Sequence, residues 1–394
     1  MIEVQYRITP LDPLISRDAR PFGAGNRVRS LEWLSQTVVA GAVRTTLWKR
    51  CANSNDDATL AALRSVEVRG VFPLRGTEED TQLCFPRPLD IIASKEGEQL
   101  KPWQINPSNV PEGCYVDMPL KGLRPVEPTN TQDDFKPEKL KPFWTSQLML
   151  HWLKEGIKDF KFDDDAMLAA PAQDERIHVN IDPQTETAQD GMLFSTTGLD
   201  FTQKDGALRQ GQISVDIVFP KGSSLPELPE RFTAPLGGER RLATFERATG
   251  DDSLWDYPKE WPESYTNGAK LRLVLATPAI FDKGWLPGWI DEKTLTGKLP
   301  DTGTEFKLVS AVTGRWQPIS GWSYEKNNPG PKPLRRAVPA GSVYFLELLS
   351  DTFTPSAWWL RSVCDNEQDR KDGFGLALWG NGFWKEKQEQ EELR

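Results

Sequence analysis

Histidine is scarce in this chain, with only His151 and His178 among 394 residues. Metal centres, nucleophilic triads and general acid–base pairs rely heavily on histidine, so a histidine-based centre is not expected. The motifs H-E-x-x-H and G-x-S-x-G and the EF-hand loop are also absent from the sequence. These absences argue against the commonest metalloenzyme and hydrolase sites.

Cysteine and long apolar runs are also in short supply. The four cysteines are scattered and form no C-x-x-C pair, which suits neither a zinc site nor a disulfide-stapled scaffold. We interpret them as reduced thiols of a cytoplasmic protein. No apolar run approaches the roughly 18 residues of a membrane-spanning helix, and the first residues lack a signal-peptide pattern. The sequence therefore predicts a cytoplasmic protein without a membrane partner.

The charge balance excludes general binding to polyanions. The chain has 48 Lys and Arg against 57 Asp and Glu, a net charge of −9, so its long-range field repels phosphate. One stretch has the opposite sign. Residues 17–50 contain seven basic side chains and two acidic ones, so any contact with nucleic acid is expected there; the basic residues are Arg17, Arg20, Arg27, Arg29, Arg44, Lys49 and Arg50.

The hydrophobic pattern predicts mixed secondary structure in two units. Alternation predicts strands, and longer apolar periodicity predicts helices, with Ser35 as the N-cap of the first one. The predicted helices cover residues 35–49 and 142–155, and the predicted strands cover 1–9, 66–71, 177–181, 192–199, 212–219, 240–246, 270–277, 306–312 and 342–349.

The order of these elements in the first half returns in a comparable order in the second, which favours an α+β fold and a duplicated β-α-β-β-α-β plan. We accordingly divide the chain at a linker over residues 251–268, which is rich in Asp and Pro. The first domain spans residues 1–250 and carries a Pro- and Lys-rich insertion around residues 95–142, predicted as a loop. The second domain spans residues 269–394.

Two glycine loops are candidates for contact with phosphate or bases. Gly237 and Gly238 allow a phosphodiester to approach the backbone, and Arg240 and Arg241 supply charge and planar donors beside them. A plain hairpin turn is the alternative interpretation of this loop. The second loop, residues 372–379, matches an RRM base-stacking motif in part but has Asp372 where a basic residue belongs, so a simple turn into a strand is favoured.

His178 lies in a predicted strand and could act as a general base for RNA cleavage. No second catalytic group is evident near it in the sequence, so a hydrogen-bonded structural histidine is the favoured interpretation. The fifteen tryptophans could stack on bases or sugars, but large rings serve the core first, and Trp358 and Trp359 are core candidates.

Taken in order, several segments resemble one protein family. These segments are 10–14, 17–22, 35–45, 176–179, 190–194, 236–241, 276–279, 321–322, 337–344 and 373–375, and they extend nearly to the end of the chain. Together they resemble the RAMP-superfamily subunit of type III-B CRISPR (Cmr) effector complexes that binds the 5′ tag of the guide RNA. The sequence departs from the family at Ala19, where glycine is usual, and at residues 32–35. A sister type III lineage is the alternative assignment.

The resemblance implies two ferredoxin-like (RRM-like) domains with long insertions. It also implies a non-catalytic role in antiviral defence, without a cofactor or metal: holding the 5′ tag of the guide RNA (crRNA). The implied protein partners are the large polymerase-like subunit and the neighbouring backbone RAMP subunits. The RNA-binding candidates are Arg17, Arg20, Arg27, Arg29, Arg44, His178, Gly237, Gly238, Arg240 and Arg241, with Arg44 ordering the arginine loop or reaching a phosphate through it.

Two rival functions stay open at this point. A RAMP-fold endoribonuclease that processes precursor guide RNA would need His178, or a Tyr–Lys pair, beside the scissile phosphate. A carbohydrate-binding module is suggested only by the tryptophan content, and the lack of a visible secretion signal lowers its standing.

Overall fold

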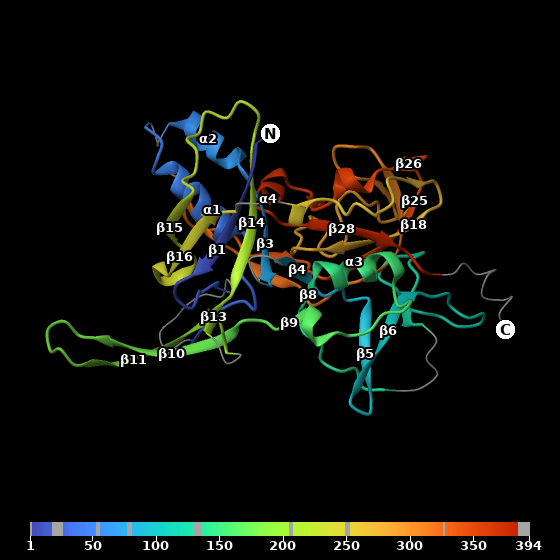
Figure 1. Cartoon of the computed structure of the whole chain (residues 1–394), viewed down its shortest axis with the longest axis horizontal. Helices are drawn as coiled ribbons and strands as arrows, with labels where there is room; N and C mark the ends of the chain where they lie inside the picture. Colours follow the sequence, from blue (N-terminus) through green and yellow to red (C-terminus); the bar gives the residue numbers. More distant parts are fainter. Residues whose placement is uncertain are drawn as a thin grey trace.

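The chain forms two β-sheets that lie side by side, with a β-hairpin projecting from one end (Figure 1). The computed structural model describes residues 2–17, 27–52, 56–76, 81–129, 135–204, 208–248, 253–325 and 328–384. Helices are few, so the fold is mixed and rich in strands, as predicted. No helix of the described residues is long and apolar enough to cross a membrane.

The first sheet has eight strands and belongs to the N-terminal half. Its spatial order is β15-β16-β1-β14-β3-β4-β8-β9. The strands are β1 (Ile2–Pro10), β3 (Glu67–Arg75), β4 (Gln82–Pro86), β8 (Phe143–Thr145), β9 (Met167–Leu168), β14 (Gln212–Phe219), β15 (Arg231–Pro235) and β16 (Leu242–Arg247).

The second sheet has six strands and belongs to the C-terminal half. Its order is β19-β20-β25-β18-β28-β27. The strands are β18 (Lys270–Leu275), β19 (Thr296–Lys298), β20 (Glu305–Val312), β25 (Val343–Leu348), β27 (Arg361–Ser362) and β28 (Leu376–Asn381).

The two sheets share one strand order. In the first, β16-β1-β14-β3 places the first strand of the half beside the third and fourth, and in the second β28-β18-β25-β20 does the same. All neighbours within these two sets of four are antiparallel. This is the order of a β-α-β-β-α-β unit. In the described residues each half, however, has α-helices in only one of its two crossovers: the second crossover of the first half, residues 220–241, and the first crossover of the second half, residues 276–304, are described and contain no α-helix.

Four α-helices occur in the described chain. They are α1 (Gln36–Trp48), α2 (Asp57–Ser65), α3 (Ser146–Glu155) and α4 (Glu367–Lys371), with α1, α2 and α4 in the crossovers. Helix α1 begins directly after Ser35, as predicted, although the Ser35 hydroxyl bonds to the Thr37 hydroxyl and not to a backbone amide. Its apolar side packs on one face of the first sheet, where Val39, Val43 and Leu47 are buried with Tyr6 and Ile217.

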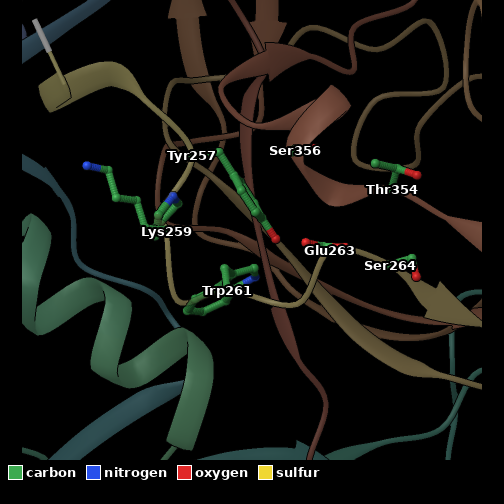
Figure 2. Close-up of a pocket in the computed structure, with 8 residues that line it drawn as sticks. Tyr257, Lys259, Trp261, Glu263, Ser264, Thr354 and Ser356 are labelled. Carbon is green, nitrogen blue, oxygen red and sulfur yellow. The ribbon is translucent and has the colours of Figure 1, made fainter.

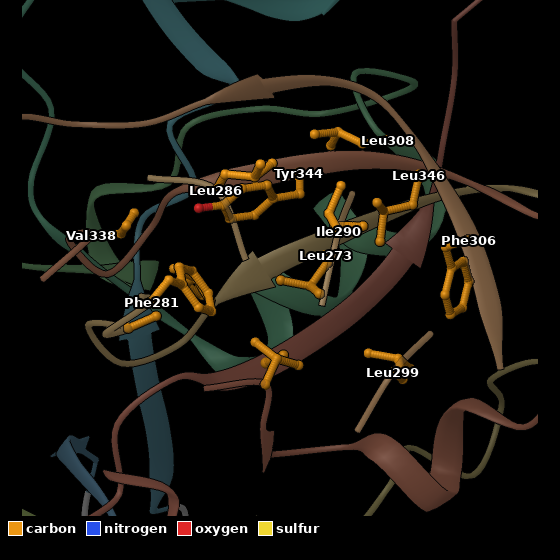
Figure 3. Close-up of a cluster of buried hydrophobic side chains, with 14 of the residues drawn as sticks. Leu273, Phe281, Leu286, Ile290, Leu299, Phe306, Leu308, Val338, Tyr344 and Leu346 are labelled. Atoms are coloured by element: carbon orange, nitrogen blue, oxygen red, sulfur yellow. The ribbon is translucent and has the colours of Figure 1, made fainter. Parts of the chain in front are cut away.

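The opposite faces of the two sheets pack against each other. Period-two alternation divides β18 between two clusters: Leu271, Leu273 and Leu275 face the outer core of the C-terminal half, shown in Figure 3, whereas Val274 and Ala276 face the first sheet. The inner cluster combines both halves and also takes in the tryptophans at 255, 261 and 359.

Arg272 lies on the inner face of β18 and carries a fully buried charge. It pairs with buried Asp90 at 2.6 Å and donates to the main-chain carbonyls of Trp152, Leu153 and Asn381. Asp90 also accepts from the Trp152 indole at 2.9 Å. This buried network of Arg272, Asp90 and Trp152 therefore joins the two halves.

Two segments predicted as loops are ordered. The insertion around residues 95–142 contains a three-stranded sheet of β5 (Ile91–Glu96), β6 (Gln99–Pro107) and β7 (Val126–Pro128), and Leu123 enters the C-terminal core. In the segment predicted as a linker, Trp255 and Trp261 are buried between the sheets. Burial of these large apolar groups fixes both segments in place.

The remaining paired strands form smaller sheets and hairpins. They are β2 (Arg27–Val28), β10 (Ala172–Ile181), β11 (Ala188–Asp200), β12 (Thr202–Lys204), β13 (Leu208–Gln210), β17 (Tyr265–Thr266), β21 (Gln317–Ile319), β22 (Trp322–Glu325), β23 (Asn328–Pro331), β24 (Arg335–Ala337) and β26 (Thr352–Phe353).

Candidate nucleic-acid interface

The two described ends of the arginine segment, residues 14–17 and 27–31, lie together after β1. Ser16 is buried where the two ends meet: its carbonyl accepts from the Leu31 amide at 2.7 Å, and its amide donates to the Ser30 hydroxyl at 2.9 Å. Arg17 bridges to Ser30 through the backbone, and Arg17 and Arg29 are both exposed. The fold thus brings two predicted RNA-contact residues together, while Arg20 lies outside the described residues.

The returning segment pairs with a long hairpin. Strand β2 runs parallel to β11, with Arg27 opposite Ser195 and Val28 opposite Thr196. The backbone of Arg27 is therefore fixed at this edge, whereas its side chain lies outside the described residues. The sheet order β10-β11-β2 places the arginine segment against the base of the hairpin.

His178 is in β10 of this hairpin. Its imidazole Nε2 is 2.8 Å from the Thr196 hydroxyl, and its ring stacks on Phe194 with 5.1 Å between centroids and an interplanar angle of 16°. Thr196 is the residue paired with Val28, so His178 lies one strand away from the arginine segment. The ring is oriented by packing and one hydroxyl, which suits a positioned contact residue.

The Gly237–Gly238 loop contacts the same region through the backbone of Ile15. The Gly238 amide donates to the carbonyl of Ile15 at 2.7 Å, two residues before Arg17. Gly237 has φ +83°, and a Cβ there would lie 2.5 Å from the Ile15 oxygen. Only glycine fits this approach. The glycines therefore hold the arginine segment by backbone contact, so a phosphate contact at the Ile15 side of Gly237 is excluded.

The rest of this loop is bent sharply. Glu239 and Arg240 both have positive φ, 57° and 52°, and the Leu236 amide donates to the Arg241 carbonyl at 2.7 Å. Arg240 is exposed and Arg241 half-buried. The buried Nε–H of Arg241 has no hydrogen-bond acceptor among the described residues. Two adjacent arginines, one with an unused donor, thus flank the segment that carries Arg17.

Arg44 does not lie with the other candidates. Its guanidinium pairs with Asp372 and donates to the carbonyls of Val66 at 2.8 Å and Lys371 at 3.2 Å. Asp372 follows α4, so Arg44 links α1 to the C-terminal half. This network holds the Arg44 side chain between the halves, and the suggestion that Arg44 orders the arginine loop or reaches a phosphate stays a prediction.

The hairpin of β10 and β11 was predicted, with a turn over residues 182–185, but its length and exposure were not. Both strands were predicted in part, and they extend well beyond the body (Figure 1). Its apolar side chains are exposed at Ile177, Val179, Ile181 and Leu193 by 73, 44, 51 and 59%. No local signal marks this exposure, because apolar and polar residues alternate along residues 177–181 as they do in a half-buried strand.

The structure also has a shallow pocket elsewhere, between residues 257–264 and 354–356 (Figure 2). Tyr257 lies across it and donates its hydroxyl to the Pro262 carbonyl at 2.7 Å. Burial raises the pKa of Tyr257 well above its ordinary value, so the hydroxyl stays protonated. None of the predicted RNA-contact residues lines this pocket.

An exposed arginine segment, an oriented imidazole and an arginine-flanked glycine loop converge in one region of a fold with duplicated strand order. Such a region suits contact with the sugar-phosphate backbone of RNA. Over residues 6–382 the sequence matches the family described as CRISPR-associated protein (Cas_Cmr3). The chain therefore belongs to this family, and the predicted membership among Cmr-complex subunits of the RAMP type is confirmed.

Comparison with other proteins adds distant similarities of fold. No curated protein is significantly similar to the chain. A chain of the cryo-EM structure of the type III-B Cmr-beta bound to cognate target RNA and AMPPnP, state 1, is 17% identical with a TM-score of 0.48, and 86% of each chain is covered. A second Cmr-beta structure, bound to cognate target RNA, gives 17%, 0.47 and the same coverage. A chain of the Csm3-Csm4 subcomplex of a type III-A interference complex gives 8% and 0.33, covering 88% of this chain and 94% of that one.

Proposed function

We propose that this chain is the non-catalytic subunit of a type III-B CRISPR interference complex that holds the 5′ tag of the guide RNA. The observation that carries the proposal is the convergence of three predicted contact segments: Arg17 and residues 27–30 meet through Ser16 and Ser30, β2 pairs with the hairpin that carries His178, and Gly238 bonds to Ile15. We call this region, with Arg17, Arg29, His178, Arg240 and Arg241, the tag interface.

The chemistry of the tag interface fits single-stranded RNA. Arginine side chains bind phosphates and fix the register, while splayed bases can be recognised along their edges or stacked on rings. In an acidic chain, concentrating exposed arginines in one region creates a local attraction for RNA and leaves the remaining surface for protein partners. We assign those partners as the large polymerase-like subunit and the backbone RAMP subunits, in the cytoplasm.

A non-catalytic role is supported by the surroundings of His178. Its ring bonds to the Thr196 hydroxyl and stacks on Phe194. Among the described side chains no carboxylate, lysine or second imidazole is hydrogen-bonded to it. A general base for RNA cleavage works best with a second group that stabilises charge or protonates the leaving oxygen.

The deciding experiment is to purify the complex from its native host through a tag on this subunit and to sequence the RNA that accompanies it. Short RNAs with one common 5′ segment and variable spacers are expected. The same purification with Arg17→Ala, Arg20→Ala and Arg241→Ala should lose RNA, while Arg64→Ala on exposed α2 should retain it. Unrelated RNA, or equal yields from all four variants, would overturn the assignment.

The ribonuclease alternative is tested on the same material. The purified chain is incubated without metal with a precursor guide RNA, and the RNA length is followed over time. We expect no change in length. Shortening of the precursor that is lost in a His178→Ala variant would establish cleavage and contradict the non-catalytic assignment.

A further inference from the structure

The C-terminal half carries a second cationic segment that lies outside the tag interface. Between Arg315 and Arg336 there are five basic residues and one acidic residue. The segment is a hairpin: β21 pairs with β24, and β22 pairs with β23 beyond them. Two hydrogen bonds to main-chain carbonyls stabilise the middle of this hairpin. The Lys332 amide donates to the Gly321 carbonyl at 2.8 Å, and the Ser320 hydroxyl donates to the Lys332 carbonyl at 2.9 Å.

Strand alternation gives this hairpin two unlike faces. Ile319 and Ala337 are buried in the core of the C-terminal half, which anchors the hairpin to the second sheet. The opposite face carries Arg336, which pairs with Pro318 across the strands, and Trp316 two residues before that proline. Trp316 is 44% exposed, an unusual position for so large a ring.

A cation–π contact fixes the exposed ring. The Arg336 guanidinium lies 4.9 Å from the centroid of the Trp316 ring. Among the side chains that the structure describes, no carboxylate pairs with Arg336, Arg315 or Lys332, and all three are exposed. The fourth cation, Arg335, bonds to the buried carboxylate of Asp369 at 2.7 Å while remaining 42% exposed. Arg335 pairs with Ile319 across the strands and so belongs to the other face. We call Arg315, Trp316, Lys332 and Arg336 the Trp316 surface.

We propose that the Trp316 surface binds single-stranded RNA as a site separate from the tag interface. A ring held in place by a guanidinium offers a platform on which a base stacks, and the surrounding cations neutralise the phosphates on either side of it. Because no described carboxylate pairs with Arg336, the cation at the ring, its charge is available to a polyanion. The proposal does not depend on the identity of the tag.

The test measures binding of a short fluorescent oligouridine RNA to the full-length chain by anisotropy. Trp316→Ala and Arg336→Ala are each expected to weaken binding about 5- to 100-fold, the range for loss of one stacked base. The matched control is Lys101→Ala: Lys101 also lies 4.9 Å from a ring centroid, that of Trp103, but pairs with Glu96, so binding should not change. Trp316→Phe keeps a ring and should retain most of the affinity, which separates stacking from misfolding.

A second measurement locates the RNA and separates this site from the first. Cross-linking with 4-thiouridine followed by peptide mass spectrometry should yield adducts within residues 315–336, and these should persist in an Arg17→Ala, Arg29→Ala variant. If oligouridine binding depends on Arg29 but not on Trp316, the proposal is wrong and single-strand binding belongs to the tag interface alone. If the Trp316 variants bind RNA normally but lose a protein subunit from the complex, the surface docks an acidic protein instead, which also overturns the proposal.

Discussion

The two halves share a strand order but use the connection after their first strand in opposite ways. In the N-terminal half, β1 leads into a segment that displays Arg17 and Arg29 and is tied back to the body by Ser16 and Gly238. In the C-terminal half, β18 leads into residues 276–304, whose apolar side chains fill the outer core; they include Leu286, Ile290, Leu295 and Leu299 (Figure 3). Equivalent connections therefore differ: the N-terminal one displays arginines ahead of its helix, and the C-terminal one fills the outer core without a helix.

The helix content of the two connections accounts for this difference. The N-terminal connection contains α1, which covers the first sheet together with Leu14 and Leu34. Arg17 and Arg29, between those two leucines, can therefore stay exposed. The C-terminal half has no helix in the described residues 276–304, and the connection itself covers the sheet.

The largest effect is expected where the two halves meet. Arg272→Met would leave buried Asp90 without its cation, and breaking a buried pair in this way costs about 3–5 kcal/mol of unfolding free energy. Urea denaturation measures the loss. The control is Lys101→Met in the exposed pair with Glu96, for which we expect about 0.5 kcal/mol or less. Equal losses of unfolding free energy in the two variants would show that the buried pair of Arg272 and Asp90 does not hold the halves together.

The contrast between the two connections is tested by removing one side chain from each. Ile290 is 1% exposed in the C-terminal core, so Ile290→Ala should cost about 2–5 kcal/mol. Leu11, at the start of the N-terminal connection, is 52% exposed, and Leu11→Ala should change stability by no more than about 0.5 kcal/mol. Calorimetric unfolding of both variants compares them directly. A small loss of stability in Ile290→Ala would mean that residues 276–304 do not have this structural role.

The tie between the glycine loop and the arginine segment predicts an effect on both stability and RNA. Gly237→Ala places a methyl group against the Ile15 carbonyl at φ +83°. Gly222→Ala shares the left-handed strain at φ +76° but has nothing within 4 Å. We expect about 1–2 kcal/mol of destabilisation at Gly222 and at least about 1 kcal/mol more at Gly237. Weaker RNA binding is expected only for Gly237→Ala, measured by filter binding with guide RNA. Equal RNA affinity in the two variants would contradict the role of this loop.

Much of the fold could be predicted because hydrophobic alternation is visible within short stretches of the sequence. Period and capping residues predict the start of α1 after Ser35 and the strands β1, β3, β14, β16, β18, β20 and β25, and Trp358 and Trp359 are in the core as predicted. The strands β4, β8, β9, β15 and β19 were not predicted, and residues 143–145 form β8 where the helix over residues 142–155 was expected to begin. The insertion could not be predicted in this way, because its strands pair with one another and its Leu123 packs on a distant sheet. Sequence spacing carries no record of such long-range contacts.

The candidate site was predictable in composition but not in geometry. A cluster of arginines identifies a basic segment, yet only the tertiary fold shows that Arg44 turns inward to Asp372 while Arg17 and Arg29 stay exposed. Likewise, Gly237 and Gly238 were recognised as a close-approach loop. Their neighbour is the backbone of Ile15, which no local pattern reveals.

The smallest expected effect is a change of stability with pH. It arises from the charge that each sheet buries on the face toward the other half. Arg272 in the second sheet is paired and bonded on all sides, whereas Asp216 in the first pairs with Arg69 but leaves its Oδ1 without a partner among the described residues. Burial raises the pKa of Asp216 to about 6, although Arg69 opposes the shift. Between about pH 4 and pH 6 the folded chain therefore binds more protons than the unfolded chain, whose aspartates titrate near pKa ~3.9, and stability falls as pH rises through that window.

Asp216→Asn cannot titrate, so its stability relative to the native chain should rise between pH 4 and pH 7 by on the order of 2 kcal/mol. Urea midpoints across this range measure the difference. Asp165→Asn, at a 97% exposed side chain, is the control and should track the native chain throughout. A native chain that is as stable relative to Asp216→Asn at pH 7 as at pH 4 would mean that Arg69 fully offsets the burial of Asp216. The two sheets would then bury their charges equally well.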